Sequence, residues 1–84
     1  MTPQELKAAR NAVGLSAEGF ARLVRVESGR TVRRWESGER EIPGPVVVLV
    51  EALMASRAVR QFFGLVVEGD LTLAAPVHSE KKGI

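Results

Sequence analysis

Capping residues and the helical spacing of apolar side chains divide the first half of the chain into short helices. The segment Thr2-Pro3-Gln4-Glu5 has a threonine suited to an N-cap, a proline at the first helical position and a glutamate that completes a capping box. Apolar residues follow at helical spacing, namely Leu6, Ala9 and Val13. Gly14 then suits a left-handed residue after the last turn. These features predict a helix over about 3–13.

Two further short helices are predicted on either side of a tight turn. Ser16 suits the N-cap of the first, which ends near Val24, and Ser28 suits the N-cap of the second, which runs to Ser37. Gly38 ends the second helix. Gly19 lies inside the first helix, where glycine costs about 1 kcal/mol relative to alanine. It indicates either the close approach of another backbone or a weak helix.

The second of these helices has two chemically different faces. Val32 and Trp35 are three residues apart and therefore share one face, which we expect to be buried. Arg30, Arg33 and Arg34 share the other face, and the side chains of Arg30 and Arg34 point the same way because they lie one turn apart. A short helix with one apolar face and one arginine face is therefore predicted.

The rest of the chain is predicted to contain a loop, two more helices and a tail. The loop covers 39–45, with Ile42 as an anchor into the core, and a fourth helix runs from Pro45 to about Ala55. Ser56 can cap a short fifth helix that ends at Gly64.

The last twenty residues differ in character from the helical part. Two β-prone runs, 65–67 and 71–73, flank a glycine-containing turn and suggest a short strand or hairpin. Residues from 74 onwards are expected to be disordered. The predicted organisation is a domain over 1–63 followed by a dimerisation segment or flexible tail over 64–84.

Charge is concentrated in one stretch of a nearly neutral chain. The formal net charge is +2 over 84 residues, yet residues 22–34 contain five arginines and one glutamate and carry +4. A local basic stripe is the pattern expected of a DNA-contact surface. The alternative is an ordinary solvated helix face.

Composition argues against several other classes of protein. The chain has no cysteine and one histidine, His78, so a zinc site or a thiol nucleophile is not expected. Paired carboxylates, a Ser/His/Asp set and a phosphate loop are not visible either, and we expect neither an enzyme nor a cofactor. The longest apolar runs are too short to span a bilayer. The sequence predicts a cytoplasmic protein without a membrane segment.

Residues 4–54 resemble the lambda-repressor-like family, the Cro/XRE type of helix-turn-helix protein, and in particular its small bacterial and prophage regulators. The matching stretches are Leu6–Arg10, Gly14–Ser16, Phe20–Leu23, Thr31–Gly38 and Ile42–Pro45. The resemblance implies an all-α domain of five helices, whose third helix enters the major groove of double-stranded DNA. It also implies a structural ion pair between Arg10 and Glu36, with Trp35 in the core.

The resemblance further implies which residues contact DNA. The predicted set is Ser16, Ala17, Ser28, Gly29, Arg30, Thr31, Arg33, Arg34 and Arg40. Gly29, Arg30, Arg33 and Arg34 occupy the positions of base contacts, which the family places on the exposed face of the third helix. Arg30 and Arg34 suit guanine, because the guanidinium fork can bond both O6 and N7. Arg33 suits a base or a phosphate, Ser28 and Thr31 suit a phosphate or a base edge, and Arg40 suits a phosphate.

Two departures from the family pattern concern this set. Position 17 is alanine where relatives commonly carry glutamine or another polar residue, so only the backbone N–H groups near Ser16 and Ala17 are left to bind a phosphate. The turn at 25–29 is also one residue longer than usual.

The resulting functional hypothesis is a transcriptional regulator, specifically a repressor that binds a palindromic operator as a homodimer. Apolar residues after the fourth helix would form the dimer contact or cover the monomer's own core: Phe62, Phe63, Leu65, Val66, Val67, Leu71 and Leu73. One alternative is an antitoxin that binds a toxin through about 64–84 and represses its own operon. Another is an adaptor module without a specific DNA site.

Overall fold

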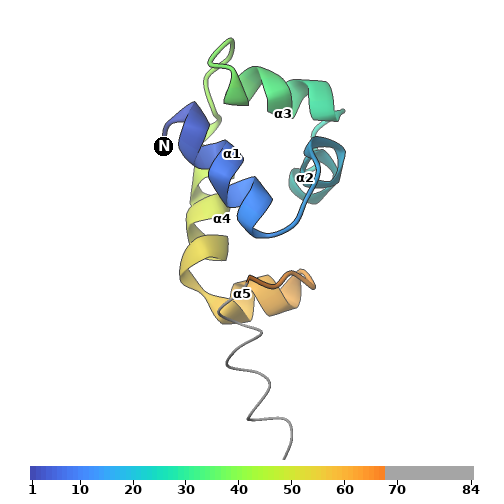
Figure 1. The fold of residues 1–84 in the computed structure, drawn as a ribbon, viewed down its shortest axis with the longest axis vertical. Coiled ribbons are helices and arrows are strands. Elements are labelled where there is room, and N and C mark those ends of the chain that lie inside the picture. The colour runs from blue at the N-terminus through green and yellow to red at the C-terminus, as the bar shows by residue number, and fades with distance from the viewer. Residues whose placement is uncertain (68–84) are drawn as a thin grey trace, which may run out of the picture.

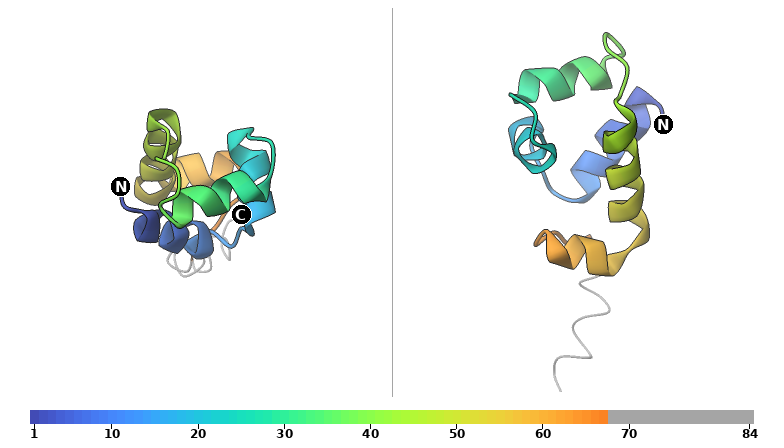
Figure 2. Two further views of the ribbon diagram at one scale, coloured as in Figure 1. Left: turned by 90° about the horizontal axis from the view of Figure 1, so that it is seen from above. Right: turned by 180° about the vertical axis from the view of Figure 1, so that it is seen from behind.

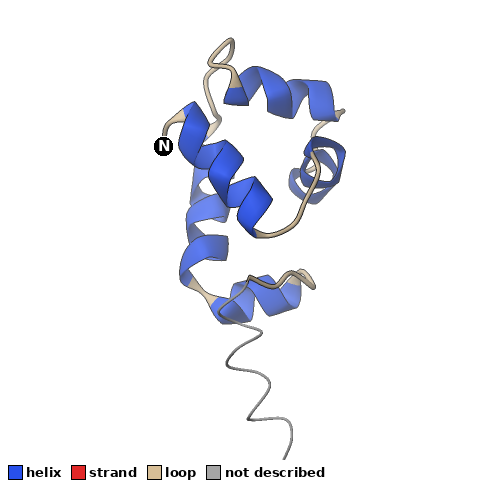
Figure 3. Cartoon of the chain, in the orientation of Figure 1, coloured by secondary structure: helices blue, strands red, loops and turns tan. Residues whose placement is uncertain are grey.

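The chain folds into five α-helices in a computed structural model that describes residues 1–67. The helices are α1 (Pro3–Ala12), α2 (Ala17–Val24), α3 (Gly29–Glu36), α4 (Gly44–Ala55) and α5 (Arg57–Phe62). No strand occurs within residues 1–67 (Figure 3). Helix α3 crosses one end of the fold and α5 lies at the opposite end, with α1 and α4 between them (Figure 1). The predicted all-α, five-helix architecture is confirmed.

Side-chain caps begin three of the helices, as predicted. The Thr2 amide donates to Glu5 Oε1 at 2.8 Å and the Glu5 amide donates to Thr2 Oγ1 at 3.1 Å, which completes the capping box of α1. Ser16 and Ser56 accept from backbone amides at the starts of α2 and α5. Ser28 occupies the N-cap position of α3, but its side chain makes no capping hydrogen bond. The predicted N-cap position of Ser28 is therefore correct, but the predicted capping by its side chain is not.

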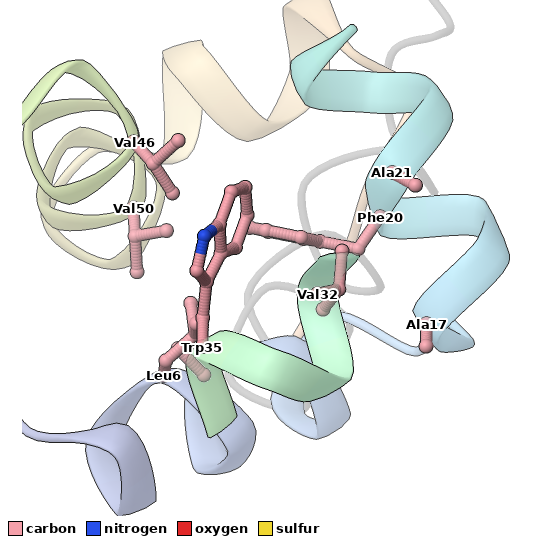
Figure 4. Packing of buried hydrophobic residues seen from close by; sticks show 9 residues of the cluster. Leu6, Ala17, Phe20, Ala21, Val32, Trp35, Val46 and Val50 are labelled. Atoms are coloured by element: carbon pink, nitrogen blue, oxygen red, sulfur yellow. The ribbon is translucent and has the colours of Figure 1, made fainter. Parts of the chain in front are cut away.

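The indole of Trp35 lies at the centre of the core. It packs between Val46 and Val50 of α4 on one side and Phe20 of α2 on the other, with Leu6 of α1 nearby (Figure 4). Trp35 is 3% exposed, which confirms its predicted place in the core. Further hydrophobic residues pack around this cluster, including Val26 and the predicted anchor Ile42. One residue of α3 thus joins three other helices.

A buried arginine joins α4 to α5. The Arg60 side chain donates from Nη1 to the carbonyl oxygens of Leu53 at 2.7 Å and Met54 at 3.2 Å. These carbonyls lie in the last turn of α4, where helix carbonyls lack partners within the helix and attract a positive charge. Arg60 is 7% exposed and therefore has a structural role that the sequence interpretation did not identify.

Of the hairpin predicted after α5, only the first run, 65–67, lies within the described residues. Residues 65–67 form no strand, and the Leu65 amide donates to the Arg60 carbonyl at 2.8 Å. The second run of the predicted hairpin, 71–73, and the predicted disordered tail lie outside the described residues. The boundary between 1–63 and 64–84 stays a prediction. Among the described helices, none combines the length and apolar character that crossing a membrane requires.

Candidate nucleic-acid interface

Helices α2 and α3 pack against each other and are joined by a turn with a left-handed residue. Arg25, the C-cap of α2, has φ 65° and ψ 40°, and its amide donates to the Ala21 carbonyl. The next amide, that of Val26, also donates to Ala21, at 3.0 Å. Side chains with a Cβ rarely adopt this conformation. Arg25 therefore holds the turn in a strained geometry that redirects the chain toward α3.

Gly29, the first residue of α3, is buried where α3 meets α2. A Cβ atom at this position would lie 2.9 Å from the Glu18 backbone nitrogen and 2.7 Å from its carboxylate. The expectation that Gly29 is exposed is therefore wrong. Its glycine allows the two helices to approach closely. At Gly19, where close approach of another backbone was one expectation, the atoms nearest to an added Cβ atom would be side-chain atoms of Ser16 and Leu15.

The exposed face of α3 is basic, as predicted. Arg30 and Arg33 are exposed and Arg34 is half-exposed, while Val32 and Trp35 on the opposite face are buried. A shallow groove of about 340 Å³ on this face is lined by Arg30, Arg33, Arg34, Ser37 and Glu39. The view from behind also shows α3 at the end of the fold away from α5 (Figure 2, right). The arginine side chains of α3 can therefore meet a large ligand from solvent.

The turn after α3 folds back along the last turn of the helix. Gly38 has φ 83°, and the Arg40 amide donates to the Arg34 carbonyl at 3.1 Å. The Ser37 hydroxyl donates to the same carbonyl at 3.1 Å and accepts from the Glu39 amide at 3.3 Å. As a result, Glu39 Oε2 lies 3.7 Å from Arg34 Nε. The sequence interpretation treated Glu39 only as a loop residue and missed this contact.

The other predicted DNA-contact residues differ in exposure. Ser16 and Arg40 are exposed, Ser28 and Thr31 are half-exposed, and Ala17 is 5% exposed within the core cluster. Any contact at position 17 would therefore come from its backbone rather than its methyl group. The Ser16 hydroxyl accepts from the Gly19 amide at 3.0 Å. These residues at the start of α2 lie on the helix that packs against α3.

An ion pair fixes the end of α3 to α1. Arg10 donates to both carboxylate oxygens of Glu36, at 2.6 Å from Nε and 3.0 Å from Nη2. The side chains are 12% and 7% exposed. The hydrogen bond to Glu36 raises the pKa of the Arg10 guanidinium, against the opposing effect of its burial. The predicted pair is confirmed, and because it is mostly buried and joins α3 to α1, its role is structural.

A comparison with protein families agrees with this geometry. A family model described as a helix-turn-helix domain matches residues 4–63. The match extends the resemblance seen in residues 4–54 through α5. No curated protein and no solved structure matches the chain.

Proposed function

This chain belongs to the helix-turn-helix domain family, and on that premise we propose that it is a transcriptional regulator that recognises a specific double-stranded DNA sequence through α3. The observation that supports the proposal most is the division of α3 into two faces. Its arginine face is open to solvent, while Val32 and Trp35 fix the opposite face in the core. The major groove of B-DNA admits one α-helix. A helix fixed from behind can therefore present its arginines to base edges.

Each exposed residue receives a role from its chemistry and position. Arg30 and Arg34 donate to O6 and N7 of guanine. Arg33 binds a base or a phosphate, and Arg40, in the turn after α3, binds a phosphate. Phosphate contacts would set the position of the domain on the duplex, and base contacts would provide the specificity.

The remaining contacts are proposed at the starts of the two helices. The backbone at Ser16 and Ala17 binds a phosphate at the N-terminus of α2, where helix N–H groups favour an anion. Ser28 and Thr31 are half-exposed at the start of α3 and contact a phosphate or a base edge. Gly29 is buried and receives no role in base recognition.

We further propose that the regulator acts as a homodimeric repressor on a palindromic operator. One short helix contacts only a few base pairs, and two-fold symmetric binding is a common solution. Phe62 is 81% exposed and Val66 50% exposed, and both lie in the α5 region. Helices α3 and α5 lie at opposite ends of each protomer (Figure 1). The α3 helices of both protomers can face the same side of a DNA duplex only if the two-fold axis runs from the α5 end of the dimer to its α3 end. The α5 helices would therefore pair side by side.

An antitoxin is the second candidate function. The same exposed aromatic and aliphatic side chains at Phe62 and Val66 would suit a different apolar protein. A toxin bound there would leave α3 able to bind DNA, which agrees with an antitoxin that represses its own operon. Copurification from the native host distinguishes the two candidates, because only the antitoxin would bring a second small protein with it.

The experiment that tests the proposal is selection of binding sites from randomised duplex DNA, with the mass in solution measured on the same sample. We expect one preferred sequence with inverted half-sites and an affinity that falls steeply with salt, because counterions are released from the phosphates. The triple variant Arg30→Ala/Arg33→Ala/Arg34→Ala should keep its helical circular dichroism and lose the preferred site. Binding of equal strength to all sequences would contradict the proposal and favour the adaptor interpretation.

A further inference from the structure

An acidic side chain lies among the arginines on the face that we propose meets DNA. Glu39 lines the same groove as Arg30, Arg33 and Arg34, and its side chain is 64% exposed. A carboxylate beside the DNA backbone is repelled by the phosphates and weakens binding to every sequence. An acid in this position therefore needs an explanation in terms of specificity.

The backbone conformation of the turn after α3 places Glu39 close to Arg34. Gly38 turns the chain with φ 83°, and the Ser37 hydroxyl bonds both the Arg34 carbonyl and the Glu39 amide. The start of the turn is therefore tied to the carbonyl of Arg34 itself. The relative position of the two residues is set by hydrogen bonds that a longer or more open loop would not make.

The approach of Glu39 to Arg34 involves one edge of the guanidinium. The carboxylate lies 3.7 Å from Nε, which is too long for a hydrogen bond and suits electrostatic attraction. A guanidinium can bind guanine through its end, with Nη1 and Nη2, or through its side, with Nε and one Nη atom. A carboxylate at Nε favours the first of these arrangements.

We propose that Glu39 is a positioning residue that determines the specificity of Arg34. It attracts the Nε edge, so that the two terminal nitrogens of Arg34 meet O6 and N7 of guanine. It also partly neutralises Arg34 and repels phosphate, which weakens binding wherever the guanine contact is missing. This inference rests on the proposed function. Because surface ion pairs contribute little to stability, the effect of Glu39 is on DNA selection and not on folding.

The test compares Glu39→Gln with Glu41→Gln. Both replace an exposed acid in the same loop with an amide of the same size, and Glu41 does not line the groove on α3. Thermal unfolding is measured first, to check that both variants are folded. Binding is then measured on the preferred duplex, on duplexes with single base changes and on an unrelated duplex.

We expect Glu39→Gln to bind the unrelated duplex more tightly, and the ratio of specific to non-specific affinity to fall roughly three- to tenfold. Glu39→Gln should weaken the base preference at the same position of the DNA site as Arg34→Ala does. In the double variant Arg34→Ala/Glu39→Gln, the preference at that position should be the same as in Arg34→Ala alone. Glu41→Gln should keep the wild-type ratio and base preferences.

Two results would overturn the inference, and they are distinguishable. In the first, the wild-type protein has a preferred site, but Glu39→Gln keeps the same base preferences or changes all affinities by the same factor as Glu41→Gln. Glu39 would then contribute only bulk negative charge, and the proposed function would stand. If the wild-type protein has no preferred site, the proposed function fails and this inference fails with it.

Discussion

The carboxylate of Glu36, the last residue of α3, accepts two hydrogen bonds from the guanidinium of Arg10 on α1, at 2.6 and 3.0 Å. The third nitrogen of Arg10, Nη1, donates to the Leu15 carbonyl at 2.9 Å, in the loop between α1 and α2. One side chain thus connects the end of α3 to the loop that leads into α2. The ion pair fixes the orientation of α3 relative to the rest of the domain.

Glu36→Ala is expected to lower the free energy of unfolding by about 1–3 kcal/mol, because it leaves a partly buried guanidinium without its carboxylate. Urea unfolding measures this change. The control Glu41→Ala removes an exposed acid and should change stability by less than about 0.5 kcal/mol. The double variant Arg10→Met/Glu36→Leu should recover much of the loss, since no buried charge remains. A Glu36→Ala protein as stable as the wild type would contradict a structural role for the pair.

Gly29→Ala is expected to destabilise the protein by about 1–3 kcal/mol. The added methyl group would lie 2.9 Å from the Glu18 backbone nitrogen, so α2 and α3 would have to separate. The matched control is Gly44→Ala, at the start of α4, where a Cβ atom meets nothing within 4 Å. That change should alter stability by less than about 0.5 kcal/mol, because the position is exposed and the added methyl group meets no neighbour. Thermal unfolding of both variants checks the prediction, and a neutral Gly29→Ala would refute the close packing described here.

Arg25→Gly is expected to stabilise the fold by about 0.5–1 kcal/mol, because glycine adopts the left-handed conformation without a Cβ penalty. Arg22→Gly is the opposite control. It removes an exposed arginine from the regular part of α2 and should destabilise by about 1 kcal/mol. Chemical denaturation compares the two. Equal losses would show that the Arg25 side chain, and not the backbone of the turn, determines stability at this position.

Arg34→Ala is expected to weaken binding to the preferred duplex by about 1–3 kcal/mol and to relax preference at one base position. Arg40→Ala should instead weaken binding to all sequences by a similar factor and reduce the slope of affinity against salt, because a phosphate contact is independent of sequence. Fluorescence anisotropy titrations at several salt concentrations measure both effects. A uniform loss for Arg34→Ala would reassign that residue to a phosphate.

Phe62→Asp is expected to convert the proposed homodimer to a monomer and to weaken binding to a palindromic site. The ring of Phe62 is 81% exposed and packs edge-to-face on Phe63, with ring centroids 4.9 Å apart. The control Val48→Asp places the same charge at a 66% exposed position on α4. Analytical ultracentrifugation provides the measurement. A Phe62→Asp protein that remains dimeric would exclude this part of α5 from the interface.

Much of the fold was predictable because its main determinants are local in sequence. The capping box at Thr2, the caps at Ser16 and Ser56 and the shared face of Val32 and Trp35 all follow from residues three apart. The structure has each of them. The five helices and the arginine face of α3 were predicted on the same basis.

The features that sequence reasoning missed depend on how separate segments meet. The burial of Gly29 arises from the approach of α2, which local spacing does not specify. Arg60 is buried because its side chain reaches the carbonyls at the end of α4, whereas a charged residue on a short helix is ordinarily expected in solvent. The contact between Glu39 and Arg34 depends on the turn at Gly38, whose direction is a property of the folded backbone.

The separation of α3 into a core side and a solvent side has a consequence for how such a protein can change over generations. The residues that hold the helix, Val32, Trp35 and Glu36, are different from Arg30, Arg33 and Arg34, which face outward. Substitutions in the outward set are expected to leave the packing of the core unchanged. On the proposed function, new DNA target sequences would therefore be accessible through single substitutions that leave the protein folded, without any change to its core.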